Sequence, residues 1–135
     1  MSPEIWGKSA WEFIHFITLA YPENATSFQK QTYKKYFDML VHVLPCDQCK
    51  KNLFQHLKEL PLTNEILSSK SKMVKWGIDL HNAVNSRNGK NKISYNEAIK
   101  NFDKLMNKNQ KNYIWIILII IIIIIGAIVY KKMIM

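Results

Sequence analysis

The chain has 135 residues, of which 48% are hydrophobic and 21% charged, so it can bury one hydrophobic core and is not a disordered tail. Its two cysteines exclude a disulfide-rich secreted scaffold and a four-cysteine zinc site. The net charge of +9 comes almost wholly from lysines scattered among asparagines, with Arg87 the only arginine, and this pattern predicts a solvated basic surface rather than nucleic-acid binding.

The first half of the chain carries start and stop signals for three helices. The sequence SAWE at positions 9–12 has the form of a capping box, and apolar residues follow it at helical spacing as far as Pro22, which predicts a first helix. The sequence TSFQ at positions 26–29 is a second capping box, and it opens a helix that Pro45 ends. A third helix is predicted over residues 46–60.

Two more helices are predicted before the chain turns strongly apolar. The fourth covers residues 69–86 and ends at the turn formed by residues 88–90, Asn-Gly-Lys. The sequence SYNE at positions 94–97 opens a short fifth helix that runs to about Met106. Because the alternation typical of strands is scarce, we expect residues 1–106 to form one all-α domain, a four- to five-helix bundle.

A long apolar segment follows. Residues 113–130, YIWIILIIIIIIIGAIVY, carry no charge and span roughly 27 Å as a helix, which matches the hydrocarbon thickness of a bilayer. We therefore predict a transmembrane helix, with a polar linker at 107–112 and a short tail at 131–135. No signal-peptide pattern precedes it, which favours a single-pass C-terminal anchor. Four lysines before the segment, against two after it, favour a cytoplasmic domain: Lys100, Lys104, Lys108 and Lys111.

The cysteine pair opens the predicted third helix. Cys46 and Cys49 are three residues apart and share one helix face, where a readily exchanged disulfide can form. The helix N-terminus favours a thiolate, so redox chemistry is the preferred interpretation. Three alternatives remain open: a zinc site completed by His42 and His56, a thioredoxin-like site, which needs βαβ units, and two inert buried cysteines. We expect no bound metal.

A second pattern lies on the predicted fourth helix. Gly77, His81 and Asn85 line one ridge, and a glycine inside a helix costs on the order of 1 kcal/mol relative to alanine. Such a glycine indicates the close approach of another group, and a flat cofactor is one candidate. Trp11 and His15 offer matching groups on the first helix. A buried core histidine is the alternative, but a dithiol that gives up two electrons needs an acceptor, and a flavin would serve.

These patterns together resemble a known family, the Erv/ALR FAD-linked sulfhydryl oxidases. The matching order and spacing extend over residues 5–102, and the short, membrane-anchored form is similar to those encoded by large cytoplasmic DNA viruses. The elements of the resemblance are Trp11-x-x-x-His15, Tyr21-Pro22, Cys46-x-x-Cys49, Trp76-x-x-x-x-His81-Asn82-x-x-Asn85 and Gly89-Lys90.

The resemblance implies an activity and a role for each matching residue. A helical bundle holds FAD, and protein dithiols are oxidised to disulfides while electrons pass through FAD to O2, which yields H2O2. Cys46 is then the outer sulfur that meets the substrate, and Cys49 is the sulfur next to the flavin. The implied FAD contacts are Gly7, Lys8, Ser9, Trp11, His15, Trp76, His81, Asn82, Asn85, Lys90 and Tyr95.

The chain also departs from the longer members of this family. It lacks a second cysteine pair, so Cys46 is expected to meet its protein dithiol substrate directly, with a thioredoxin-like or viral carrier as one candidate. The family tryptophan near the end of the domain is replaced around Phe102. We expect a homodimer, with Phe28, Tyr36 and Phe37 as candidate contacts, in a host or virion membrane. The competing hypothesis is a tail-anchored zinc-binding or adaptor protein without enzymatic activity.

Overall fold

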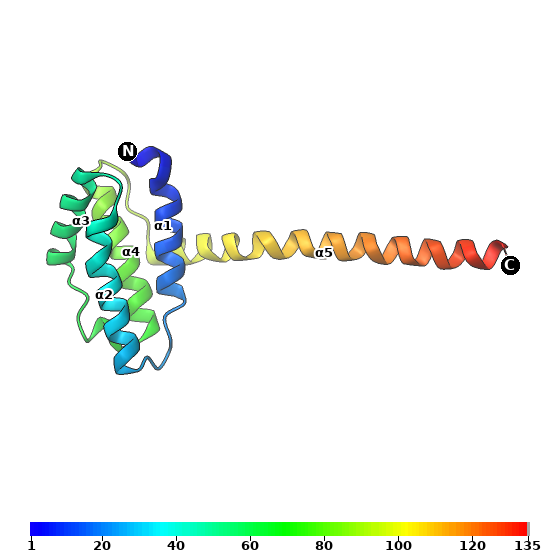
Figure 1. Cartoon of the computed structure of the whole chain (residues 1–135), viewed down its shortest axis with the longest axis horizontal. Helices are drawn as coiled ribbons and strands as arrows, with labels where there is room; N and C mark the ends of the chain where they lie inside the picture. The colour runs from blue at the N-terminus through cyan, green and yellow to red at the C-terminus, as the bar shows by residue number, and fades with distance from the viewer. Residues whose placement is uncertain (135) are drawn as a thin grey trace. The chain divides into compact units, whose positions relative to one another are not determined.

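The computed structural model describes residues 1–134, including the side chains of all but residues 108–112 and 134. Over this range the chain forms helices and no strand, which confirms the predicted all-α class (Figure 1). It divides into two units, Met1–Tyr95 and Asn96–Met135, which are described separately. The helices are α1 (Pro3–Leu19), α2 (Ser27–Val43), α3 (Asp47–Glu59), the short 3-10 helix η1 (Ile66–Ser68), α4 (Lys70–Arg87) and α5 (Tyr95–Ile134).

Helix α1 begins earlier than the sequence predicted. Pro3 occupies the start of the helix and Glu4 its first turn. Proline has the φ angle that a first helical turn requires, and an acidic side chain there complements the helix dipole. The capping box predicted at positions 9–12 is therefore wrong, because Ser9 lies inside the helix.

The predicted starts of α2 and α4 are confirmed. The Thr26 hydroxyl accepts a hydrogen bond from the Gln29 backbone N–H (3.2 Å), and the Gln29 side chain accepts one from the Thr26 backbone N–H (2.9 Å). This reciprocal pair satisfies two backbone donors that a helix start leaves open. The Ser69 hydroxyl caps α4 by accepting from the Lys72 backbone N–H at 3.4 Å.

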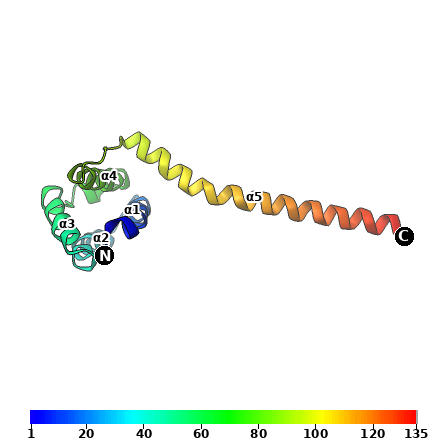
Figure 2. The same cartoon turned by 90° about the horizontal axis from the view of Figure 1, so that it is seen from above.

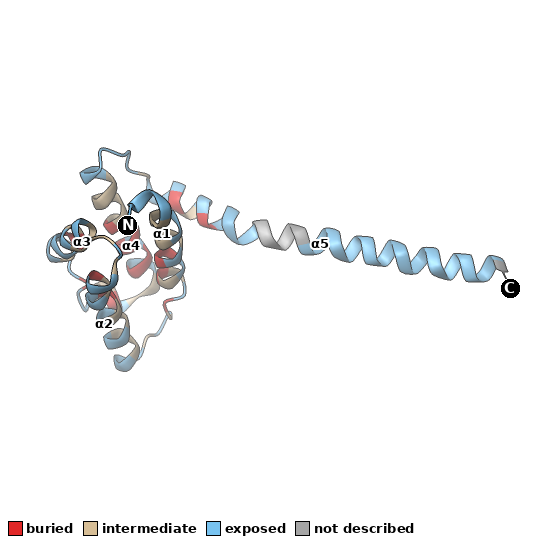
Figure 3. Ribbon diagram, turned by 45° about the horizontal axis from the view of Figure 1, so that its top comes forward, coloured by how far each residue is buried: buried red, intermediate tan, exposed pale blue. Residues whose placement is uncertain are grey.

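The first unit packs its four long helices around one core, and Figure 2 views them nearly end-on. The buried residues lie on the faces that these helices turn toward one another, and the outer faces are exposed (Figure 3). The Trp76 ring meets Phe37 edge-on, with centroids 4.7 Å apart. η1 was not predicted, and it brings Leu67 into the core, where the backbone carbonyl of this residue accepts a hydrogen bond from the Tyr21 hydroxyl at 2.7 Å.

Gly77 allows α1 and α4 to approach each other closely. A Cβ at this position would lie 2.9 Å from Cγ2 and 3.2 Å from Oγ1 of Thr18, which is fully buried on α1. Such a contact is too short for a real Cβ, so any larger residue here would require the Thr18 side chain or the helices to shift. The expectation that Gly77 makes room for a flat cofactor is therefore wrong, because the Thr18 side chain fills that space.

Helix α5 makes up nearly all of the second unit. The structure has one helix from Tyr95 to Ile134, where the sequence suggested a short helix and then a separate linker at 107–112. That linker contains neither glycine nor proline, so nothing in it interrupts a helix. Within the described residues, one stretch is long and apolar enough to cross a membrane, Tyr113–Met133, with a mean hydropathy of 3.1. The predicted limits of the domain, linker and tail remain predictions.

Candidate active site

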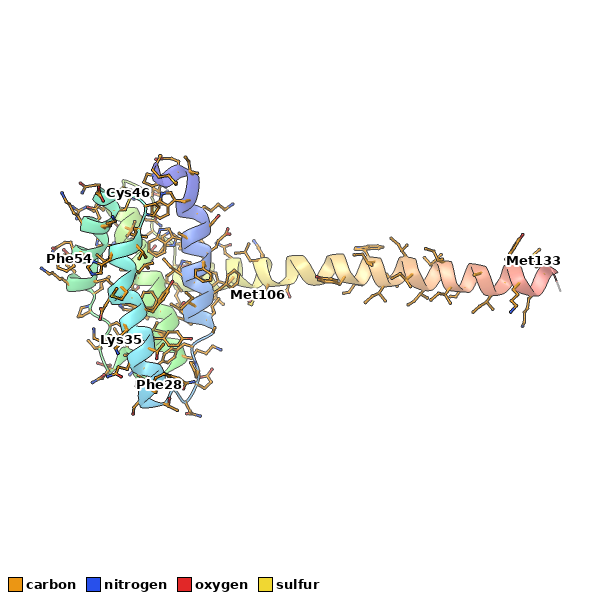
Figure 4. All side chains as sticks on the ribbon, viewed as in Figure 1. Phe28, Lys35, Cys46, Phe54, Met106 and Met133 are labelled. Atoms are coloured by element: carbon orange, nitrogen blue, oxygen red, sulfur yellow. A yellow bond between two sulfur atoms is a disulfide. The ribbon has the colours of Figure 1, made fainter. Side chains whose placement is uncertain are left out.

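The two cysteines form a disulfide at the start of α3. Cys46 is the N-cap residue, and its Sγ accepts a hydrogen bond from the Cys49 backbone N–H at 3.2 Å. The two Cα atoms are 5.1 Å apart, and both residues are half-buried. In Figure 4, Cys46 lies at the end of the unit where α3 begins. The disulfide is thus partly accessible and lies at the positive end of a helix dipole.

The two cysteines lie at different positions around the start of α3. Cys49 is on the same helix face as Leu53 and His56, which are both buried. Cys46 is at the edge of that face, on the side of Lys50. The assignment of Cys49 as the sulfur next to the flavin and of Cys46 as the outer sulfur remains a prediction.

Charged side chains surround the first turn of α3. Lys50 lies 3.0 Å from the Asp47 carboxylate, and this hydrogen bond holds the pKa of Asp47 below its usual value, with help from the charge of Lys51. Both partners are at the protein surface, so the pair contributes little to folding. Lys51 follows in the same helix turn. It is exposed and has no ion-pair partner among the described residues, so it is a free positive charge near the disulfide.

A stacked aromatic group joins α1 to α4. The Trp11 indole lies parallel to the His81 imidazole, with centroids 4.1 Å apart and an interplanar angle of 5°. His15 Nε2 and His81 Nδ1 are 2.9 Å apart and form a hydrogen bond. The first and fourth helices therefore place side by side the three residues that the sequence singled out.

Both imidazoles are neutral at physiological pH. Burial, and then the charge of His81, lowers the pKa of His15 to about 4. Burial, and then the positive charge of Lys90, lowers the pKa of His81 to about 4. A neutral imidazole has one N–H and one bare nitrogen, so one ring donates to the other in this pair.

The loop after α4 carries Lys90. Gly89 has a φ of 67°, a left-handed conformation that favours glycine, and the Lys90 backbone N–H donates to the Asn85 carbonyl at 2.8 Å. Asn82 fixes the far end of this loop: its amide donates to the Ile93 carbonyl (2.9 Å) and accepts from the Ile93 N–H (3.0 Å). The side chain of Asn82 therefore positions the loop, and a direct cofactor contact from it remains a prediction.

Trp76 lies in the core. Only 3% of this residue is exposed, and its indole N–H donates to the Leu60 carbonyl at 2.9 Å. It points about 140° around α4 from His81, since five residues separate the two. The structure thus gives Trp76 a packing role, and its cofactor contact remains a prediction.

The remaining predicted residues lie on more open surface. Gly7 is half-buried, and a Cβ at this position would have no heavy atom within 4 Å. Lys8, Ser9 and Tyr95 are exposed. Their roles remain predictions.

The structure adds two residues that sequence reasoning missed. Thr18 sets the distance between α1 and α4, and nothing in its spacing reveals this, because the contact with Gly77 is long-range. The indole N–H of Trp6 is buried and has no hydrogen-bond partner among the described residues.

The alternative zinc site lacks a suitable set of ligands. It needs His42 or His56 close to the two sulfurs, and no group of three histidine, cysteine or acidic residues in the described part of the chain is placed to hold a metal ion. His56 is 5% exposed, and His42 is at the surface. The thioredoxin-like alternative fails as well, because residues 1–134 contain no strand.

Comparison with known proteins matches this arrangement to one family. Residues 8–111 match the Erv1 / Alr family. A protein of Acanthamoeba polyphaga mimivirus named "Probable FAD-linked sulfhydryl oxidase" is 43% identical over 119 residues, which are 87% of this chain and 83% of that protein. The mitochondrial FAD-linked sulfhydryl oxidase of Saccharomyces cerevisiae is 28% identical, over 67% of this chain and 46% of that protein. The crystal structure of the FAD binding domain of Erv1 from the same yeast has a TM-score of 0.65 at 28% identity and covers 71% of this chain and 89% of its own.

Proposed function

Because the chain belongs to the Erv1/Alr family, we propose that it is an FAD-linked sulfhydryl oxidase that forms disulfides in protein substrates. A substrate dithiol loses two electrons and two protons, and O2 takes them up to give H2O2. The observation that carries this proposal is the disulfide of Cys46 and Cys49 at the start of α3, in the helical unit that also holds the Trp11–His81 stack. FAD, when bound, supplies a ring that takes up two electrons and passes them to O2.

The residues near the histidine pair have the chemistry that FAD requires. Asn85 is half-buried, and its side-chain amide has no hydrogen-bond partner among the described residues, so it can both donate and accept. Lys90 supplies a positive charge for the pyrophosphate, and Trp11 supplies a flat apolar surface. The open space at Gly7 lets a ligand approach the backbone of α1. We place the cofactor against Gly7, Lys8, Ser9, Trp11, His15, His81, Asn85, Lys90 and Tyr95, with Trp76 and Asn82 as supports.

The disulfide exchanges with the substrate at Cys46. A substrate thiolate attacks the Cys46 Sγ, the bond between the two enzyme sulfurs breaks, and Cys49 leaves as a thiolate. The N-terminus of α3 stabilises that negative charge. The second substrate thiol then attacks the mixed disulfide and releases an oxidised substrate and a reduced Cys46. Two substrate thiols have become one disulfide, and the enzyme holds the two electrons.

The histidine pair supplies a neutral and rigid wall. Because both pKa values are near 4, neither imidazole carries a charge that would repel a flat ring or attract water at neutral pH. The hydrogen bond between His15 and His81 fixes the plane of both rings. Trp11, stacked on His81, extends this wall along α1.

The proposed assembly uses surfaces of the chain outside this site. We propose that Tyr113–Met133 anchors the enzyme in a host or virion membrane, with the helical unit in the cytoplasm. An exposed apolar stripe on α2, formed by Met39 and Val43, supports self-association. Together with Tyr36, these residues line a shallow cavity of about 340 Å³. Phe28 is exposed at one end of this helix, whereas Phe37 is buried in the core and is excluded from any such contact. The substrate is a protein dithiol, and a thioredoxin-like carrier is the proposed form.

A spectrum of the purified full-length chain tests the function. In detergent, the protein is expected to be yellow, with flavin absorbance at about 450 nm that bleaches under a dithiol without air and returns in air. Stoichiometric H2O2 should accompany the oxidation. A colourless protein that stays colourless after incubation with FAD would refute the proposal.

A further inference from the structure

A groove lies between α2 and α3, the helix that the disulfide opens, and has no role in the chemistry described above. It has a volume of about 290 Å³ and is lined by Asp38, Val41 and His42 of α2 and by Phe54, Leu57 and Lys58 of α3. Resting on the proposed function, we propose that this groove binds the substrate polypeptide next to its reacting thiol. The occupant it fits is a segment with one bulky apolar side chain and neighbouring acidic residues.

The groove lies along the helix that carries the outer sulfur. Cys46 is the N-cap of α3, and Lys50 and Phe54 follow it at intervals of four residues, so Phe54 lies roughly 80° around the helix from the start of α3. Cys46 and Phe54 are separated by roughly 12 Å along the helix axis. About four residues of an extended chain span that distance. Figure 4 shows both side chains along this helix, with Phe54 directed outward.

The floor of the groove is apolar, and part of it is open. Val41 is 7% exposed and Leu57 is half-buried, so they form its base. Phe54 is 51% exposed. An exposed aromatic ring beside a concave apolar surface is the usual anchor of a protein contact.

The rim of the groove carries a net positive charge. Its acidic group Asp38 is neutralised by Lys34 at 3.1 Å. Lys58 lies over the Phe54 ring, with its Nζ 4.3 Å from the centroid, and has no ion-pair partner in the described part of the chain. Nearby, Asp47 pairs with Lys50 at 3.0 Å, and Glu59 lies 3.7 Å from the His56 ring, which pairs with it only when that ring is protonated. The two lysines Lys51 and Lys58 outnumber this one remaining carboxylate, and they favour an acidic partner.

The groove is distinct from the stripe proposed for self-association. Asp38 and His42 are on a different side of α2 from Met39 and Val43, roughly 100° away around the helix. Self-association through the stripe therefore leaves the groove open. This separation makes the substrate polypeptide, rather than a second copy of the chain, the occupant that the surfaces favour.

The test compares two substrates on the FAD-loaded full chain in detergent. Dithiothreitol is too small to reach the groove from Cys46. The second substrate is a reduced synthetic peptide with a Cys-x-x-Cys pair, a phenylalanine four residues beyond it and flanking glutamates. A matched peptide replaces the glutamates by lysines and the phenylalanine by serine. We expect the acidic peptide to have a kcat/KM at least tenfold above that of the matched peptide.

Two variants probe the groove. Phe54→Ala should lower kcat/KM for the acidic peptide about tenfold and leave dithiothreitol oxidation unchanged, and tenfold corresponds to about 1.4 kcal/mol. Lys58→Glu, at the surface, should weaken the preference for the acidic peptide, and high salt should weaken it in the wild type. Phe13→Ala removes an exposed phenylalanine on α1, which contributes nothing to the groove, and should change neither rate.

Several outcomes would overturn the proposal. One is a wild type that oxidises both peptides equally well. Another is a pair of variants that slow both substrates alike or slow neither. A third is a Phe54→Ala protein whose oligomeric mass falls while its peptide kinetics stay the same, which would assign the groove to a second copy. A wild type that fails to oxidise dithiothreitol would instead refute the proposed function itself.

Discussion

The indole of Trp11 lies flat against the imidazole of His81, 4.1 Å away between centroids, and this stack connects the first and fourth helices of the unit. His15, one turn after Trp11, reaches the same imidazole with a hydrogen bond of 2.9 Å. Two side chains from α1 thus hold one from α4. Trp11 and His81 therefore belong both to the packing of α1 on α4 and to the proposed cofactor wall. Substitutions at these residues can be tested for their effect on stability and on FAD binding.

Trp11→Ala is expected to reduce the amount of FAD that co-purifies with the full chain. The change removes a stacking surface worth about 0.5–1.5 kcal/mol, so FAD affinity should fall roughly two- to tenfold. The measurement is the ratio of flavin to protein absorbance after dialysis. Trp115→Ala, in the apolar part of α5, is the matched control and should keep a wild-type ratio. Equal losses in both variants would contradict a specific role for Trp11.

Acid should destabilise the helical unit through the two histidines. Their pKa values drop from 6.5 in the unfolded chain to about 4 in the folded one, so between these values the unfolded chain binds more protons. The free energy of unfolding is then highest above pH 6.5 and falls as the pH is lowered toward 4. Urea titrations followed by tryptophan fluorescence at several pH values measure this slope.

A variant separates the histidine effect from that of the carboxylates. His81→Phe keeps a ring against Trp11 but cannot take up a proton, so the loss of stability between pH 6.5 and 4 should be smaller than in the wild type. His42→Gln, at the surface, serves as the control. An unchanged slope for His81→Phe would show that the pair does not titrate in this window.

Gly77→Ala should destabilise the unit by about 1–3 kcal/mol, because its new Cβ would overlap the Thr18 side chain. Replacing Thr18 by alanine as well removes the overlapping atoms and should recover part of that loss. Gly7→Ala is the control: it is also in a helix but meets no atom within 4 Å, so it should be neutral or stabilising. Denaturation midpoints of the FAD-free chains decide the matter, and similar effects at both glycines would argue against the steric reason.

Serine substitutions at the two cysteines should impair the oxidase in different ways. Cys49→Ser is expected to abolish oxidase turnover, since the inner thiolate is lost. Cys46→Ser should retain bound flavin, with an altered visible spectrum, but should no longer exchange with a dithiol substrate. Turnover assays and spectra of the two variants, with the unsubstituted chain in parallel, test this. Undiminished activity in either variant would contradict the assigned roles.

Local signals in the sequence were enough for most of the helices. Thr26 caps α2 as predicted, because a capping side chain bonds to a backbone group only three residues away, and α4 begins where the sequence predicted, with Ser69 as its cap. The predicted start of α1 was wrong because Ser9 and Glu12 have the spacing of a capping box but lie in the middle of a helix that begins at Pro3. η1 was missed because Leu67 is held by burial in the core and not by a local pattern.

The part of the candidate site on α4 could be predicted because its residues recur at the spacing of a helix turn. His81 and Asn85 share a ridge with Gly77, and the sequence singled out Trp11 and His15 on the first helix as matching groups. The reason for Gly77 could not be read from the sequence, since Thr18 is far away along the chain and only the packing of α1 on α4 brings it close. The bonds between Asn82 and Ile93 are likewise a product of how the loop folds back.

The Sγ of Cys46 has two duties, since it closes the disulfide and also accepts the first amide hydrogen bond of α3. Reduction removes only the first of these. A sulfur that has become a thiolate still accepts from the Cys49 N–H, and more strongly, because the acceptor now carries charge. The scaffold therefore has no need to unwind or re-form its helix in each catalytic cycle, so the cost of switching between the oxidised and reduced enzyme falls on the sulfur chemistry alone.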